Sequence, residues 1–128
     1  MKVKTSELTG RGLNAAVAVA LGAKIVKTPE SQSWMFHWPP GMMHSVDPRW
    51  TPWVPDYCDG DDRASVQKAM KVLERERMVI NPIGGWHALG ANMPASKTSY
   101  GPTSIIAIWR CFVTSKLGDE VEIPKELL

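Results

Sequence analysis

The chain has only two cysteines, Cys58 and Cys111, among its 128 residues, and they form no CxxC unit. So few thiols do not suggest the disulfide framework of a small secreted protein, and they lack the paired spacing of a cysteine zinc site. Two buried free thiols are the simplest interpretation, and a reducing compartment fits them best.

The chain also lacks an excess of either charge and a long apolar run. Fifteen basic and 13 acidic residues leave a net charge of +2, too little for a protein whose main task is to neutralise nucleic-acid phosphates. The apolar run at residues 13–21 is shorter than the roughly 20 residues of a membrane span. No Ala-x-Ala cleavage site follows it, and Glu7 interrupts the basic region before it, so it does not resemble a signal peptide. We expect a cytoplasmic protein with no membrane segment.

What is present is an ordinary globular composition, with 44% apolar and 22% charged residues. A chain of this length can bury about two thirds of the surface that its unfolded form exposes. We therefore predict a single domain over residues 1–128 that needs neither a disulfide nor a metal to fold.

Three stretches have the spacing of helices. Residues 13–21 carry one apolar face, and Gly22 follows where a helix commonly ends. Asp61 or Asp62 is expected to begin a second helix. Its apolar stripe consists of Val66, Ala69, Met70 and Leu73. Residues 102–117 are apolar around so much of their circumference that we expect this helix at the centre of the molecule.

Strands are predicted around residues 25–26 and in a β-hairpin near 78–89, where Gly84-Gly85 allows a tight reversal. Residues 38–61 hold five of the ten prolines and should form a long irregular loop rich in proline and tryptophan. The predicted fold is α+β. In it a small antiparallel sheet, including the hairpin, packs around the central C-terminal helix, with an N-terminal helix beside them.

Four stretches of the sequence match the pattern of a known family. They are MKVKTSELTG at residues 1–10, LERER at 73–77, the segment 101–110 that opens with GPT, and SKLGDEV at 115–121. Together they resemble the phage NinX family, a domain of unknown function from tailed phages and bacterial prophages. The resemblance implies a phage or prophage origin and a location in the host cytoplasm, and it implies no activity. The chain departs from the family at Asn14-Ala15, where the family usually has Asp-Trp, and in its longer, more helical segment 56–73.

No motif for catalysis or metal binding is present. A zinc site could be assembled from the groups His37, His44, Asp47, Asp56, Cys58 and His87, but neither HExxH nor paired cysteines occur. The aspartates at 56, 59, 61 and 62 lack the glycine and final glutamate of a calcium loop. Neither a Gly-x-Ser-x-Gly elbow nor a local signature around a cysteine marks a nucleophile. We predict no metal and no cofactor. Whether the protein is an enzyme stays open, although the absence of a motif favours a non-enzyme.

Aromatic side chains are the main candidates for a site. Trp34, Trp38, Trp50 and Trp53 are close in sequence, and Tyr57 follows them. They can pin the loop to the sheet, or they can form an aromatic groove or patch for a partner.

Arg75 lies in the LERER stretch. It either belongs to a solvated helix end or pairs with a carboxylate such as Asp61.

Two functions fit this sequence. The sequence favours the first, a non-enzymatic phage accessory protein that binds another phage or host protein through the tryptophan–proline loop. The alternative is a small-molecule or nucleotide-binding domain, which could be an enzyme. In it Trp53, Tyr57, Trp86 and His87 line a pocket, and Arg75 or Arg110 holds an anion. Nucleic acid is a disfavoured partner, and a homodimer is compatible with the sequence. The candidate binding residues are Trp50, Trp53, Tyr57, Asp61, Arg75, Trp86, His87 and Arg110.

Overall fold

The computed structural model describes residues 1–27, 29, 34–38, 50–51 (backbone only) and 56–128. Most of the predicted proline- and tryptophan-rich loop, including Trp53, lies outside these residues. The described elements are three α-helices, short antiparallel strands and three 3-10 turns, which confirms the predicted α+β class. The 3-10 turns are η1 (Thr5–Glu7), η2 (Ala95–Lys97) and η3 (Lys125–Leu127).

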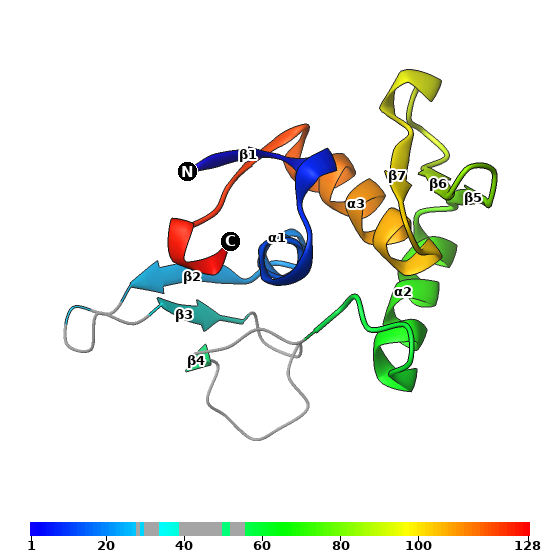
Figure 1. Ribbon diagram of the computed structural model, residues 1–128. Coiled ribbons are helices and arrows are strands. Elements are labelled where there is room, and N and C mark those ends of the chain that lie inside the picture. Colours follow the sequence, from blue (N-terminus) through cyan, green and yellow to red (C-terminus); the bar gives the residue numbers. More distant parts are fainter. Residues whose placement is uncertain (28, 30–33, 39–49, 52–55) are drawn as a thin grey trace.

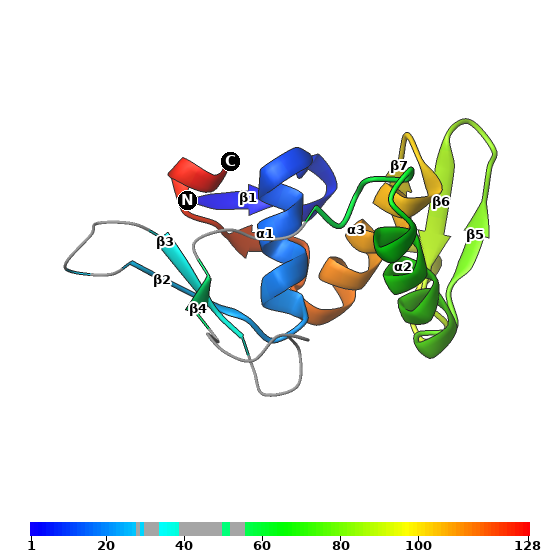
Figure 2. The same ribbon diagram turned by 90° about the horizontal axis from the view of Figure 1, so that it is seen from below.

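Helix α3 (Ser104–Leu117) is the centre of the molecule, as predicted from its apolar circumference. Trp109 and Ile108 on this helix are completely buried. The helix begins at Thr103, whose hydroxyl accepts a hydrogen bond from the Ile106 backbone N–H at 3.2 Å. In Figures 1 and 2 it lies between helix α1 on one side and helix α2 with a three-stranded sheet on the other.

Helix α1 (Gly10–Ala20) packs its small side chains against α3, and it ends before Gly22, as the sequence predicts. Asn14 of α1 is buried, and its side-chain oxygen accepts a hydrogen bond from the Tyr57 backbone N–H at 3.0 Å. The adjacent Ala15 is buried too. Asn14 and Ala15 are therefore interior positions, and Asn14 anchors the segment that leads into α2.

Helix α2 (Arg63–Arg75) begins at Asp62, whose carboxylate accepts a hydrogen bond from the Ser65 backbone N–H at 3.1 Å. Asp62 is thus the cap, and Asp61 is not. Ala69 of the predicted stripe is buried, whereas its other three members are half-buried beside the more deeply buried Val72.

The predicted hairpin is present as β5 (Val79–Asn81) and β6 (Trp86–Leu89), with Gly84 and Gly85 at positive φ in the turn. A third strand, β7 (Ser99–Gly101), extends this sheet on the other side of β6. Strands β6 and β7 contact α3 along much of its length. This sheet and α3 form the scaffold of the site described below.

Two further sheets complete the fold. The predicted strand near residue 25 is β2 (Lys24–Lys27), which pairs with β3 (Trp34–His37), and β4 (Trp50–Thr51) follows in the same sheet. The two ends of the chain meet where β1 (Lys2–Lys4) pairs with β8 (Glu120–Glu122), and the labelled termini lie near each other in Figure 1. None of the helices in the described part of the chain has the length and apolar content of a membrane span.

Candidate functional site

Two hollows lie side by side along the C-terminal half of α3. The first, which we call the arginine hollow, has a volume of about 350 Å³ and is bounded by the β1–η1 corner, the segment 96–100 and α3. Seven of its twelve wall residues carry a hydroxyl group, namely Thr5, Ser6, Ser96, Thr98, Ser99, Tyr100 and Thr114. Its charged residues are Lys4, Lys97, Arg110, Asp119 and Glu120.

Arg110 is the buried cation of this hollow, with 9% of the residue exposed. Its Nε and Nη2 donate hydrogen bonds to the Leu8 carbonyl oxygen at 3.1 and 2.9 Å. Its Nη1 donates to the Tyr100 carbonyl oxygen at 2.7 Å. The guanidinium therefore ties the start of α1 and strand β7 to the central helix. Each terminal nitrogen keeps a second N–H for which the described residues supply no acceptor.

No carboxylate neutralises Arg110 within the described part of the chain. Asp119 forms an ion pair with Lys97, and Glu120 stands opposite Lys4 in the β1–β8 pair. The carbonyl oxygens of Leu8 and Tyr100 accept hydrogen bonds from Arg110, but they carry no net charge and so do not neutralise it. Burial lowers the pKa of the Arg110 guanidinium from its ordinary value, and the nearby Cys58 opposes this change. An arginine nevertheless stays charged at neutral pH, so the hollow has a buried positive charge without a counterion.

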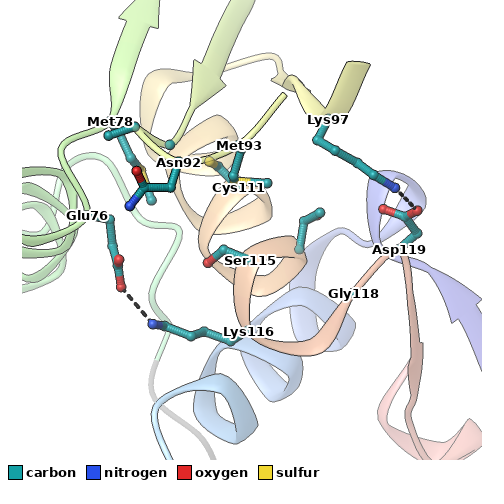
Figure 3. Close-up of a pocket in the computed structure, with 13 residues that line it drawn as sticks. Glu76, Met78, Asn92, Met93, Lys97, Cys111, Ser115, Lys116, Gly118 and Asp119 are labelled. Carbon is teal, nitrogen blue, oxygen red and sulfur yellow. Dashed lines mark hydrogen bonds and ion pairs between the residues drawn. The ribbon is translucent and has the colours of Figure 1, made fainter. Parts of the chain in front are cut away.

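The second hollow, which we call the methionine hollow, has a volume of about 450 Å³. Met78, Met93 and Cys111 give it a sulfur-rich wall. Figure 3 shows two ion pairs at opposite sides of it, Glu76 with Lys116 and Lys97 with Asp119. The Lys116 Nζ lies 3.0 Å from the Glu76 carboxylate. Since its charges are paired, this hollow suits a neutral group better than an ion.

The two hollows share three wall residues, Lys97, Thr114 and Asp119. The Lys97–Asp119 ion pair is thus the partition between a cationic, hydroxyl-lined space and a neutral, sulfur-lined one.

Neither cysteine is set up as a nucleophile. Burial raises the pKa of the Cys58 thiol to about 12, and the Asp56 carboxylate adds to this rise while Arg110 opposes it. Burial also raises the pKa of the Cys111 thiol, against a hydrogen bond with the Gly90 backbone. At neutral pH both groups are thiols, whereas nucleophilic catalysis needs the thiolate. Within the described residues, no three histidine, cysteine or carboxylate side chains gather closely enough to hold a metal ion.

The predicted aromatic pocket is wrong for Trp86 and His87. Neighbouring residues of a strand point to opposite faces of the sheet, so these two cannot line one cavity. Trp86 packs against the hydrophobic core on the inner side, and the ring of His87 lies 4.4 Å from the ring of Tyr100, its partner across the strands. Trp53 lies outside the described residues, as does the side chain of Trp50.

Tyr57 is an interior residue. It is 2% exposed, its ring lies 5.5 Å from the ring of Trp109, and its carbonyl oxygen accepts the Trp109 indole N–H at 2.8 Å. Burial raises the pKa of its phenol, which has no hydrogen-bond partner within the described residues. Tyr57 also borders a third hollow of about 390 Å³ with Asp56, Asp59 and Lys68, and Arg110 is not among its lining residues.

The predicted pairing of Arg75 with Asp61 is also wrong. Asp61 precedes α2 and Arg75 is its last residue, so the two are about 20 Å apart at 1.5 Å of rise per residue. The Asp61 backbone N–H instead donates to the Asp59 carboxylate at 2.9 Å. The Arg75 guanidinium lies 5.7 Å from the centre of the Phe112 ring, and it lines neither hollow of the site.

Eight residues were candidates from the sequence. Among those whose side chains the structure describes, only Arg110 lines either of the two adjoining hollows. The methionine hollow was missed because Met78 and Met93 lie in two separate loops and Cys111 lies in α3, so the three share no sequence pattern. In comparisons with known proteins, no family model and no curated protein matches this chain.

Proposed function

We propose that this protein is a small-molecule-binding domain whose arginine hollow holds an anionic group. The proposal rests on one observation, the buried and unneutralised guanidinium of Arg110 in the wall of a hydroxyl-lined hollow. It corresponds to the second of the two functions considered from the sequence. The protein-binding alternative depends on the side chains of Trp50 and Trp53, which the described geometry does not include.

The electrostatics favour an anion at this place. Removing a charge from water is costly, and proteins usually offset the cost with a partner of opposite sign. The charges of Lys97 and Lys4 are matched by Asp119 and Glu120, so Arg110 supplies the surplus positive charge. A bound anion would act as its missing counterion.

The donor pattern favours a phosphate group in particular. A guanidinium presents parallel N–H groups that suit a tetrahedral oxyanion, and Arg110 has two terminal N–H groups to spare. The hydroxyls of Thr5 and Thr98 already donate to the carbonyl oxygens of Gly118 and Ala95. Those of the other wall residues, Ser6, Ser96, Ser99 and Thr114, can donate hydrogen bonds to the remaining oxygens. We propose binding without catalysis, in a phage or prophage accessory protein of the host cytoplasm, as the resemblance to the NinX family implies.

Isothermal titration calorimetry with inorganic phosphate, at ionic strength held constant with chloride, tests this function. The wild-type protein should bind one phosphate per chain, and Arg110→Gln should abolish the heat. Arg63→Gln is the matched control, since it removes the same charge from an exposed position that borders neither hollow.

Because Arg110 also holds two backbone segments, circular dichroism must show that the Arg110→Gln variant is folded. If it is not, Lys4→Gln is the second variant. It removes an exposed cation from the edge of the hollow and should weaken phosphate binding by about twofold to fivefold. A wild-type protein that binds no phosphate, or a folded Arg110→Gln variant that binds it normally, contradicts the proposal.

A further inference from the structure

The geometry points to a more specific ligand, an aromatic phosphate monoester that occupies both hollows. Its phosphate lies against Arg110 and its aromatic group lies in the methionine hollow. This inference rests on the proposed anion site and extends it across the partition formed by Lys97 and Asp119.

The continuity of the two hollows is the first observation. They share Lys97, Thr114 and Asp119. A ligand that reaches from one hollow into the other therefore passes Thr114 of α3. A phosphate alone would leave the methionine hollow empty, although it is the larger of the two, at about 450 Å³ against about 350 Å³.

The weakness of the partition is the second observation. The side chains of Lys97 and Asp119 are 43% and 62% exposed, and an exposed ion pair of this kind contributes little to stability. The 3-10 turn that carries Lys97 hydrogen-bonds within itself, from Lys97 N to Pro94 O at 2.9 Å and from Thr98 N to Ala95 O at 3.2 Å. Lys97 can therefore leave Asp119 and turn toward a bound phosphate without unfolding this turn.

The chemistry of the methionine hollow is the third observation. Thioethers make favourable contacts with aromatic rings, and they adapt to flat groups because their side chains are unbranched. Met78 and Met93 contribute two of them, and the Glu76–Lys116 pair at the far rim leaves no net charge to attract a second anion. The pair can still hydrogen-bond polar atoms on the edge of an aromatic group, such as a nucleobase.

Gly90 sets the position of Met93 in this hollow. A Cβ atom built on Gly90 would lie 3.1 Å from the Met93 sulfur, closer than such atoms normally approach. The absence of a side chain at Gly90 thus lets Met93 fold back and keeps the hollow open. Gly90→Ala is for this reason a mild change that alters the methionine hollow and leaves Arg110 untouched.

The experiment compares the affinities of inorganic phosphate, phenyl phosphate and adenosine monophosphate by calorimetry. Burial of an aromatic ring should make phenyl phosphate bind at least about tenfold more tightly than inorganic phosphate. Tighter binding of adenosine monophosphate than of phenyl phosphate assigns the site to nucleotides, and the reverse order assigns it to simple aryl esters. Either order supports the inference.

Met93→Ala should remove most of the gain from the aromatic group and leave the affinity for inorganic phosphate unchanged. Met70→Ala is the matched control, since Met70 is a half-buried methionine that borders neither hollow, and it should change neither affinity. If Met93→Ala does not fold, Gly90→Ala takes its place, with a smaller expected loss that again affects phenyl phosphate and not inorganic phosphate.

The methionine methyl signals give a direct readout in the folded wild-type protein. Phenyl phosphate should shift the ¹³C-methyl resonances of Met78 and Met93 by ring currents, while that of Met70 stays in place. If inorganic phosphate binds and neither aromatic ester binds more tightly, the inference is wrong and the anion site stands. If no phosphate compound binds, the proposed function itself is wrong.

Discussion

At the scale of single residues, Arg110 links the packing of the fold to the proposed site. Its three hydrogen bonds run to the carbonyl oxygens of Leu8 and Tyr100, which lie far apart in the sequence. A lysine has no planar fork to reach both carbonyls and would fit this place poorly. The same rigid geometry keeps the remaining N–H groups fixed in direction, which lowers the entropic cost of binding an anion.

The thiols predict how stability depends on pH. Burial raises the pKa of Cys58 to about 12, above the value of about 8.5 for an unfolded thiol. Between these two values the unfolded chain binds fewer protons than the folded protein, so stability falls as the pH rises from about 9 toward about 12. The slope is at most about 1.4 kcal/mol per pH unit for each thiol. Urea unfolding at a series of pH values measures it.

Cys58→Ala should make this alkaline loss of stability shallower, because it removes one of the groups with a raised pKa. Cys111 and Tyr57, whose pKa values are also raised by burial, account for what remains. An unchanged slope in the variant would show that the Cys58 thiol titrates alike in the folded and unfolded states.

Gly101 shows why glycine opens the GPT stretch. A Cβ atom at this position would lie 2.7 Å from the backbone nitrogen of Ala107, so strand β7 approaches α3 too closely for any side chain. We expect Gly101→Ala to destabilise the fold by about 1–3 kcal/mol, as overpacking does elsewhere. Gly60→Ala is the control, since a Cβ atom there would meet nothing within 4 Å and the change should be nearly neutral. Equal unfolding midpoints for the two variants would refute this explanation of the glycine.

At the scale of elements, the β1–β8 pair is one part of the fold that no sequence pattern predicted. Lys2 and Lys4 stand opposite Glu122 and Glu120, with Val3 opposite the buried Val121. The complementary stretches KVK and EVE are the signal that could have revealed the pair. Each strand has three residues, and they come from opposite ends of the chain, so no local pattern marks them. The acidic C-terminal segment is consequently part of a sheet.

Helix capping gives a prediction at this scale. Thr103 caps α3 through its hydroxyl, whereas Thr9 precedes α1 and makes no side-chain cap. Thr103→Ala should therefore lower the free energy of unfolding by about 0.5–2 kcal/mol. Thr9→Ala should have a clearly smaller effect, and chemical denaturation of the two variants compares them. A larger loss at Thr9 would mean that the hydroxyl bond at Thr103 does not stabilise α3.

At the scale of the whole molecule, the helices and the hairpin could be predicted because their apolar spacing and their glycines are local features of the sequence. The apolar circumference of residues 102–117 placed α3 at the centre, and the glycines at 84 and 85 located the turn of the hairpin. Strand β7 was missed because Ser99–Gly101 is too short to show a period. The prediction that Trp86 and His87 line one pocket was wrong, because neighbouring side chains along a strand point to opposite faces of the sheet.

The site could not be predicted to the same extent, since it depends on contacts between distant segments. Arg110 was a candidate for an anion from its residue type alone. Its lack of a counterion follows from the pairing of Lys97 with Asp119 and from the meeting of β1 with β8. The partition between the hollows likewise exists only in the folded chain.

The central claim is that Arg110 binds an anion, and the side-chain NMR signals of this arginine test it most directly. In ¹⁵N-detected spectra, phosphate should shift the Arg110 Nη resonances along a saturable curve, while those of Arg75 and Arg63 stay in place. The Nε resonance should move less, because its hydrogen bond to Leu8 is already formed. Arg110 resonances that stay constant up to saturating phosphate would contradict the account.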